Sequence, residues 1–185
     1  MTYDFSKLRV LVVDDNPPMR MLVRGILETF GVKSVDDAEN GEEAFKLFNN
    51  ISHDLVIADW MMEPMDGIEL TRNIRNSQGS SDPYVPIILI TGYAQKKRVF
   101  QARDNGVTEF LVKPFTANDL YKRMVQVIER PRRFIKSNSY IGPDRRRASK
   151  EKYNGPLKRK EDHDKLRSRV SDKIDMVTSP QKGDQ

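Results

Sequence analysis

The sequence contains no cysteine, so it forms no disulfide bond and offers no thiolate ligand to a metal. Hydrophobic residues make up only 37% of the 185 residues, which is low for a chain packed from end to end. No apolar run approaches membrane-spanning length, and the first residues lack the basic and apolar regions of a signal peptide. We therefore expect a soluble, cytoplasmic protein with no transmembrane segment.

Acidic and basic residues are unevenly distributed along the chain. Residues 1–130 contain 16 Lys and Arg against 19 Asp and Glu, which gives a net charge of −3. Residues 131–185 contain 16 against 8, a net charge of +8, so the basic pI of about 9.4 is due to this segment. The change in composition predicts one domain of ordinary size followed by a basic tail.

Short apolar runs alternate with helical patterns through the first part of the chain. The runs predict buried strands at residues 8–13, 32–38, 55–58, 85–91 and 108–112. Apolar residues at helical spacing follow each run, and candidate N-caps precede four of these helices: Asp15 or Asn16, Asn40, Asp66 and Thr116. The remaining helix is expected over about 94–104. Five βα units in succession predict a doubly wound α/β fold, with a parallel sheet covered on both faces.

Polar side chains follow four of the predicted strands. Asp14 and Asp15 come directly after the first strand, Asp59 after the third, Thr91 ends the fourth and Lys113 follows the fifth. In sheets of this kind, ligands bind outside the carboxyl ends of the strands. We therefore expect these side chains to form one site.

Three carboxylates in one site repel one another and raise each other's pKa unless a cation is present. Mg²⁺ suits such a site because it prefers oxygen ligands and is usually completed by water and phosphate. One carboxylate can then act as a nucleophile on a phosphoryl group, while Lys113 and Thr91 contact the phosphoryl oxygens. The set of residues predicts phosphoryl transfer.

With these landmarks in this order, residues 6–130 resemble a receiver domain of the bacterial two-component response regulators. The resemblance implies a flavodoxin-like (βα)5 sheet with strand order 2-1-3-4-5. It also implies that Asp59 accepts a phosphoryl group from a sensor histidine kinase or a small phosphodonor. A protein of this kind carries a signal, and it is not an enzyme beyond its own phosphorylation and dephosphorylation.

The same resemblance implies a metal site for Mg²⁺, with Mn²⁺ as an alternative. In this assignment Asp15 binds the metal directly, and Asp14 holds it mainly through water. The acceptor Asp59 and the backbone carbonyl of Met61 would complete the protein ligands.

The resemblance also implies a switch pair made of Thr91 and Phe110. The hydroxyl moves to the phosphoryl group and the aromatic ring turns inward behind it. Lys113-Pro114 matches a Lys-Pro pair whose peptide bond is typically cis, and Asp66-Gly67 matches the pair that opens the third helix.

The sequence departs from the family pattern close to the acceptor. Glu63 stands where many relatives have proline, and Pro64 follows it. Met61 and Tyr93 lie two residues after the acceptor and two after the switch threonine, and neither can orient an attacking water as an amide or carboxylate would. We hypothesise a phosphoryl group that persists.

Several of these residues also have a purely structural interpretation. Asp14 and Asp15 could cap the first helix, Thr91 could be an ordinary strand residue, and Phe110 could belong to a static core.

Three further side chains suggest function by their type alone. We expect Trp60 to be a surface or loop aromatic, and His53 and His163 to face solvent without a role in phosphate relay.

Residues 131–155 mix charge with proline and glycine and show no core pattern, so we expect the tail, 131–185, to be mostly disordered. A thin apolar stripe predicts a short helix over about 158–177 that forms on contact with a partner. The excess of Lys and Arg suits an acidic protein, an anionic lipid surface or nucleic acid, and a solvated linker without a target is the alternative.

Three functions fit the sequence. The first, which we favour, is a stand-alone receiver whose phosphorylation switches binding to a downstream protein target. The second is a shuttle that passes the phosphoryl group to a histidine phosphotransfer protein, and the third is a regulator that uses its basic tail on nucleic acid.

Overall fold

The computed structural model describes residues 4–76, 78–92, 100, 102–129, 131–137 and 140–144. Tyr93, the first part of the helix expected over 94–104, and everything beyond residue 144 lie outside the described residues. The helix expected over 158–177 and His163 are therefore outside them too.

The core of the molecule is a parallel sheet of five strands. Their order in the sheet is β2-β1-β3-β4-β5, and every neighbouring pair is parallel. This confirms the predicted doubly wound fold and its strand order 2-1-3-4-5. The strands are β1 (Arg9–Val13), β2 (Ser34–Ala38), β3 (Leu55–Asp59), β4 (Ile87–Thr91) and β5 (Glu109–Val112).

Four helices of the structure flank this sheet: α1 (Pro17–Thr29), α2 (Gly41–Asn50), α3 (Gly67–Asn76) and α5 (Ala117–Glu129). Side-chain oxygens cap their N-termini as the sequence predicts. Asn16 accepts a hydrogen bond from the backbone N–H of Met19 and Asn40 from that of Glu43. Asp66 does the same for the first turn of α3. Because Asn16 caps α1, the alternative role of Asp14 and Asp15 as its cap is wrong.

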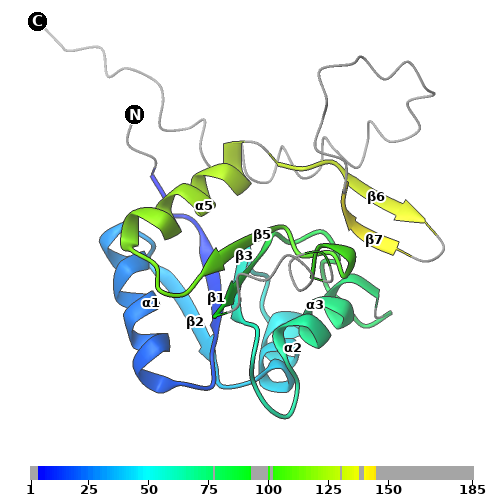
Figure 1. The fold of residues 1–185 in the computed structure, drawn as a ribbon, viewed down its shortest axis with the longest axis horizontal. Helices are drawn as coiled ribbons and strands as arrows, with labels where there is room; N and C mark the ends of the chain where they lie inside the picture. The colour runs from blue at the N-terminus through cyan, green and yellow to red at the C-terminus, as the bar shows by residue number, and fades with distance from the viewer. Residues whose placement is uncertain are drawn as a thin grey trace, which may run out of the picture.

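The helices form two layers, with α1 and α5 on one face of the sheet and α2 and α3 on the other (Figure 1). Successive strand residues point to opposite faces, so each strand supplies both layers. In β1, for example, Val10 and Val12 pack with the first pair of helices, and Leu11 and Val13 with the second. β3 and β4 are buried along their whole length, which explains their continuous apolar sequences.

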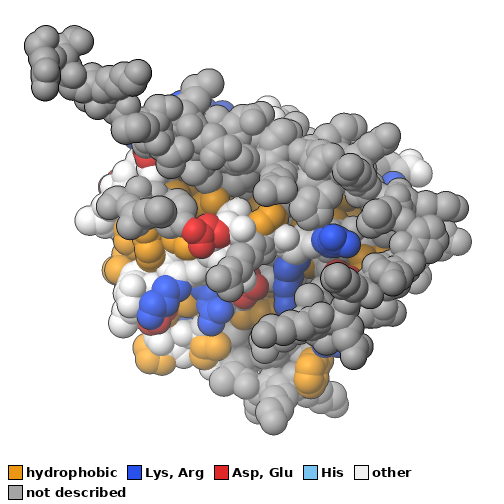
Figure 2. Space-filling model, turned by 90° about the horizontal axis from the view of Figure 1, so that it is seen from above, with side chains coloured by type: hydrophobic (Ala, Val, Ile, Leu, Met, Phe, Trp, Pro, Cys, Tyr) orange, Lys and Arg blue, Asp and Glu red, His pale blue; other side chains and the backbone are white. Residues whose placement is uncertain are grey.

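None of the described helices combines the length and hydrophobicity that crossing a bilayer requires. On the face shown in Figure 2, the hydrophobic side chains of the described residues are interspersed with charged and other polar ones.

A two-stranded antiparallel sheet follows the five-stranded one. Strands β6 (Phe134–Ser137) and β7 (Tyr140–Pro143) pair from Phe134 with Pro143 to Ser137 with Tyr140. The disorder expected from residue 131 onward is therefore wrong for residues 134–137 and 140–143. The hairpin lies against α3 (Figure 1), and β7 contacts this helix.

Two side chains expected at the surface are buried. Trp60, only 5% exposed, packs in the core between the sheet and α2 and α3, because its backbone N–H bonds to the Ile90 carbonyl and extends the pairing of β3. His53 lies with Nε2 3.2 Å from Oδ2 of Asp36, and its ring stacks on Phe48. Burial lowers the pKa of His53 although Asp36 acts to raise it. His53 is therefore not the solvent-facing group that we expect from the sequence, and Trp60 is a loop residue, as expected, but a buried one.

Candidate functional site

Asp14 and Asp59 lie side by side at the carboxyl ends of the neighbouring strands β1 and β3. The register of β1 and β3 pairs Val13 with Ala58, so the next residue of each strand is at the same level of the sheet. Both side chains are buried, with 2% of Asp14 and 6% of Asp59 exposed. The sheet itself therefore brings together two of the predicted site residues.

Lys113 contacts both carboxylates from the end of β5, at the same edge of the sheet. It directly follows β5, and its backbone N–H bonds to the Thr91 carbonyl at 2.8 Å. Its Nζ lies 2.5 Å from Oδ1 of Asp59 and 3.3 Å from Oδ2 of Asp14. The peptide bond from Lys113 to Pro114 is cis, as the family resemblance implies.

Each carboxylate is also held by a backbone amide. Met61 N–H donates to Oδ2 of Asp59 at 2.7 Å, and Asn16 N–H donates to Oδ1 of Asp14 at 2.9 Å. With the two contacts to Lys113, all four carboxylate oxygens have a donor. The orientation of both side chains is therefore fixed before any ligand binds.

The charges of this group are not balanced. Burial raises the pKa of Asp59, the contact with Lys113 opposes that rise, and the nearby charge of Asp14 adds to it. Burial acts to lower the pKa of Lys113, but its hydrogen bond and ion pair with Asp59 outweigh this, so the pKa is raised. Two carboxylates share one ammonium group, which leaves the site with net negative charge.

The donor set suits a hard divalent cation, because it consists of carboxylate oxygens with an excess of negative charge. Asp15, however, is exposed and is not drawn into the acid pair. Within the described part of the chain, no group of three or more Asp, Glu, His or Cys side chains is arranged to hold a metal ion. The roles of Asp15 and of the Met61 carbonyl as metal ligands therefore stay predictions.

Arg20 is a site residue that the sequence analysis missed. Its guanidinium donates from Nη1 to the Asp14 carbonyl at 2.7 Å and from Nη2 to Oε1 of Glu39 at 3.0 Å. Its Nε lies 3.6 Å from Oδ2 of Asp37, and only 11% of the side chain is exposed. Arg20 thus ties the acidic segment after β1 to the end of β2. Its place one turn into the helix after the acid pair is the only signal in the sequence.

Gly67 brings the start of α3 directly against the acceptor residue. Its N–H bonds to the Trp60 carbonyl at 3.0 Å, and a Cβ at this position would collide with the backbone oxygen of Asp59. A larger residue at this position would push α3 away from the site. The requirement explains the glycine of the Asp66-Gly67 pair in physical terms.

Thr91 and Phe110 lie on β4 and β5, the two strands that follow the acceptor strand β3 in the sheet. Thr91 ends β4 and is fully buried, while Phe110, in β5, is half-buried against the core on the α2 and α3 side. Leu89 pairs with Phe110 and Thr91 with Val112, so the two residues sit on neighbouring strands. Their movement as a switch pair stays a prediction.

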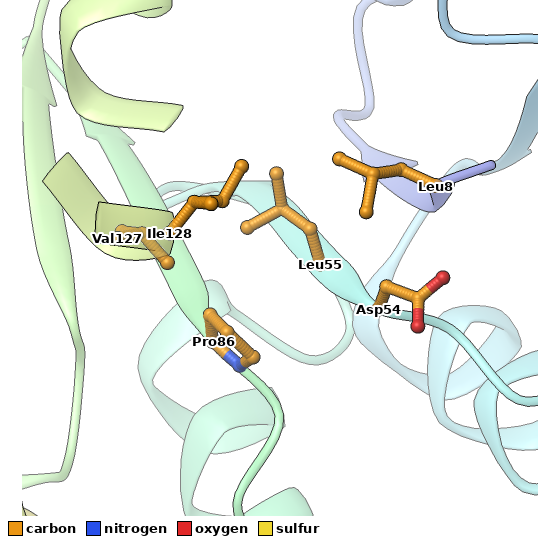
Figure 3. Close-up of a pocket in the computed structure, with 6 residues that line it drawn as sticks. All are labelled: Leu8, Asp54, Leu55, Pro86, Val127 and Ile128. Atoms are coloured by element: carbon orange, nitrogen blue, oxygen red, sulfur yellow. The ribbon is translucent and has the colours of Figure 1, made fainter. Parts of the chain in front are cut away.

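A small apolar pocket lies at the opposite edge of the sheet (Figure 3). Leu8 precedes β1, Leu55 begins β3 and Pro86 precedes β4, so the pocket is at the amino ends of the strands and away from the acid pair. Its lining residues are Leu8, Asp54, Leu55, Pro86, Val127 and Ile128. It contributes no group to the site described above.

Comparison with known proteins identifies the family of this domain. Residues 10–125 match the family described as response regulator receiver domain. The chain is 32% identical over 125 residues to chemotaxis protein CheY-3 of Vibrio cholerae, which covers 68% of this chain and 95% of that protein. It is 29% identical over 123 residues to chemotaxis protein CheY of Pseudomonas aeruginosa, covering 66% of this chain and 98% of that one.

Solved structures give the same result. CheY4 of Vibrio cholerae superposes with a TM-score of 0.60 at 29% identity, over 65% of this chain and 98% of that one. The receiver domain of the Francisella response regulator 1452 gives a TM-score of 0.61 at 27% identity, over 67% and 98% of the two chains.

This chain belongs to the response regulator receiver domain family. Receiver domains generally interact with histidine kinases and with downstream targets, and the relatives named above include chemotaxis regulators. The matched region ends at residue 125, so the hairpin and the basic tail lie beyond it.

Proposed function

We propose that this protein is a response regulator whose Asp59 accepts a phosphoryl group from a histidine kinase in a Mg²⁺-dependent reaction. Phosphorylation then switches its binding to a downstream protein. The observation that carries the proposal is the Lys113 ammonium held between the buried carboxylates of Asp14 and Asp59 at the carboxyl edge of the sheet.

In this reaction an oxygen of Asp59 bonds to phosphorus while the bond from phosphorus to the donor breaks, and its electron pair leaves with the donor. The product is an acyl phosphate. The Lys113 ammonium contacts one oxygen of Asp59, so it is placed to bind the phosphoryl oxygens when negative charge moves onto them. The Met61 N–H keeps the second oxygen of Asp59 in place. Asp59 must be ionised to react, so its raised pKa makes the lysine contact important.

A bound Mg²⁺ supplies positive charge that offsets the phosphoryl oxygens and the carboxylates. Asp14 and Asp59 would hold it, joined by Asp15 and the Met61 carbonyl. The excess negative charge of the buried acid pair supports this assignment.

The switch consists of Thr91 on β4, the strand next to the acceptor strand, and Phe110 on β5, one strand further on. A phosphoryl group on Asp59 draws the hydroxyl of Thr91, and the space behind it admits the Phe110 ring. The receiver then exists as an inactive and an active population. Phosphorylation shifts the equilibrium toward the active one to the extent that the phosphoryl group makes better contacts in it.

Exposed apolar side chains at the edge that carries the site support a protein partner. Met21 is 73% and Leu22 52% exposed on α1, which begins just after the acid pair, and Met61 is 53% exposed beside the acceptor. Isolated apolar side chains are common on protein surfaces, but these three accompany the reactive group. They suit a protein donor better than a small phosphodonor alone.

A phosphate shuttle is the second candidate. Met61 supplies no polar side chain to orient a water molecule at Asp59, and this favours a long-lived phosphoryl group that a histidine phosphotransfer protein could receive. A role of the basic tail on nucleic acid stays a third possibility with no support among the described residues.

The proposal is tested by incubating the full chain with Mg²⁺ and acetyl phosphate and measuring its intact mass in acid. We expect the mass of one phosphoryl group to be added, and neither Asp59→Asn nor the metal-depleted protein should gain it. No mass increase, or an increase that survives Asp59→Asn, would remove the proposed function.

A further inference from the structure

The hairpin of β6 and β7 packs around a buried arginine of α3. Arg75 is only 1% exposed, and its guanidinium lies 5.0 Å from the centre of the Phe134 ring. The edge of the same ring meets Tyr84, with 5.6 Å between centroids. The contact combines cation–π and aromatic interactions, which are strongest away from water.

Arg75 also binds the turn that precedes β5 and the loop that precedes β4. Its Nε donates to the Gly106 carbonyl at 3.1 Å and its Nη1 to the Pro83 carbonyl at 2.9 Å. Arg72, one turn earlier in α3, donates to Oδ1 of Asn105. Burial lowers the pKa of Arg75 to about 9, although the nearby charge of Asp82 acts to raise it. A cation buried in this way stays in place only while its partners stay assembled.

The hairpin reaches the same turn through a contact between two glycines. A Cβ on Gly142 would lie 2.7 Å from Cα of Gly106 and 2.5 Å from the hydroxyl of Tyr140. That hydroxyl donates to the Pro143 carbonyl at 2.8 Å and lies 3.4 Å from the carbonyl of Arg103. We refer to Arg75, Tyr84, Arg103 and Gly106 as the hairpin-binding surface. The fit is close and leaves no room for a side chain at Gly142.

Helix α3 connects this surface to the acceptor. Its first residue, Gly67, contacts the backbone of Asp59, and its last turn carries Arg75. The helix has 10 residues, which corresponds to about 15 Å along its axis. Its buried side chains pack in one core with the sheet, so the helix moves as a unit.

We infer that the hairpin is a regulatory element whose docking is coupled through α3 to the state of Asp59. The inference rests on the proposed function. The hairpin closes on α3 in the arrangement in which Lys113 and the Met61 amide hold both oxygens of Asp59. Phosphorylation converts one of these oxygens into the bridge to phosphorus, and at least one of the two contacts must rearrange. Docking and phosphorylation therefore oppose each other.

This coupling gives the basic tail a connection to the site. Asp144 N–H bonds to the Arg133 carbonyl at 2.6 Å, at the open end of the hairpin. Arg145, Arg146 and Arg147 follow immediately in the sequence. Release of the hairpin changes where these charges can act.

The test uses the full chain and beryllofluoride with Mg²⁺ as a reversible analogue of the phosphoryl group. Hydrogen exchange of residues 134–143 is measured with and without beryllofluoride. The affinity of the protein for beryllofluoride is measured by the fluorescence of Trp60, the single tryptophan. Gly142→Ala disrupts docking by its Cβ, and Phe134→Ala disrupts it by loss of the ring. Gly25→Ala is the matched control, because a Cβ there meets nothing within 4 Å.

We expect beryllofluoride to speed exchange in the hairpin of the unaltered protein. Both disrupting variants should bind it about fivefold more tightly or better, because coupling between two sites is reciprocal. Gly25→Ala should match the unaltered protein. Unchanged hairpin exchange in the presence of saturating beryllofluoride, or unchanged affinity in both variants, would overturn the inference and leave the proposed function standing. If Asp59 takes neither beryllofluoride nor a phosphoryl group, both fail.

Discussion

The ammonium of Lys113 lies 2.5 Å from Oδ1 of Asp59, although the two residues are 54 positions apart in the sequence. The contact exists because β3 and β5 both flank β4 and end at the same edge of the sheet. It opposes the rise in pKa that burial imposes on Asp59. The nucleophile of the proposed reaction is thus kept in its reactive form by a residue of another strand.

Replacing Asp59 by Asn should stabilise the fold at neutral pH. The pKa of Asp59 is raised above its ordinary value of 3.8, so ionisation of this carboxyl costs the folded state free energy. Below pH 3.8 the carboxyl is neutral in the folded and unfolded chains, and the two proteins should then be equally stable. The advantage of Asp59→Asn should grow as the pH rises through the folded-state pKa.

Urea unfolding of both proteins at several pH values measures this difference. A stability loss in Asp59→Asn at pH 7 would mean that the contact with Lys113 outweighs burial.

Arg20→Gln should slow phosphorylation of Asp59 and destabilise the fold. It removes the guanidinium that holds the Asp14 carbonyl, and hydrogen bonds from charged groups contribute about 1.5–3 kcal/mol. Arg24→Gln is the matched control, since Arg24 pairs with Asp37 at the surface of the same helix. The phosphorylation rates of the two variants are compared at limiting and at saturating Mg²⁺. Equal rates in both variants would exclude a positioning role for Arg20.

Gly67→Ala should destabilise the protein by about 1–3 kcal/mol, the usual cost of overpacking. The added methyl group collides with the backbone of Asp59 and displaces α3. Gly25→Ala, in open space on α1, should leave stability unchanged or raise it. Urea titration of the two variants decides the matter, and a harmless Gly67→Ala would contradict the close packing at the acceptor.

Met61→Asn should shorten the lifetime of the phosphoryl group. An amide at this exposed position beside Asp59 can orient an attacking water, which the methionine cannot. The decay of the phosphorylated species after removal of the donor gives the lifetime of each protein. If the two proteins lose the group at the same rate, Met61 does not explain a persistent signal.

Removing the hairpin together with residues 145–185 should cost more stability than removing residues 145–185 alone. Truncation after residue 144 keeps the cation–π and aromatic contacts of Phe134, whereas truncation after Glu129 exposes Arg75 and Tyr84 and loses about 1–3 kcal/mol. The melting temperatures of the two truncated proteins test this. Equal values would show that the hairpin does not contribute to the folded domain.

The sheet and the acid pair could be predicted from the sequence because they depend on local patterns. Continuous apolar runs specify buried strands, and a polar residue after such a run must fall at the carboxyl edge of the sheet. That reasoning places Asp14, Asp59 and Lys113 in one site, and the structure joins them by hydrogen bonds. The cis peptide bond before Pro114 follows from the family resemblance and is also found.

The hairpin and its surface could not be predicted in this way. Its strands have four residues each and only a few apolar side chains, so they carry no clear period. What stabilises them is a buried arginine in α3 and a glycine before β5, and neither residue type signals such a contact in sequence. His53 was misjudged and Arg20 was missed for the same reason. A polar side chain is exposed or buried according to partners that lie elsewhere in the chain.

The position of the phosphoryl group is the most direct test of the account. The full chain is treated with Mg²⁺ and acetyl phosphate and then reduced with borohydride, which converts an aspartyl phosphate into homoserine. Peptide mass spectrometry then locates the modified residue. We predict homoserine at position 59 alone, and its loss when Mg²⁺ is removed. Modification at Asp14, at Asp15 or at a histidine, with Asp59 intact, would contradict the central claim.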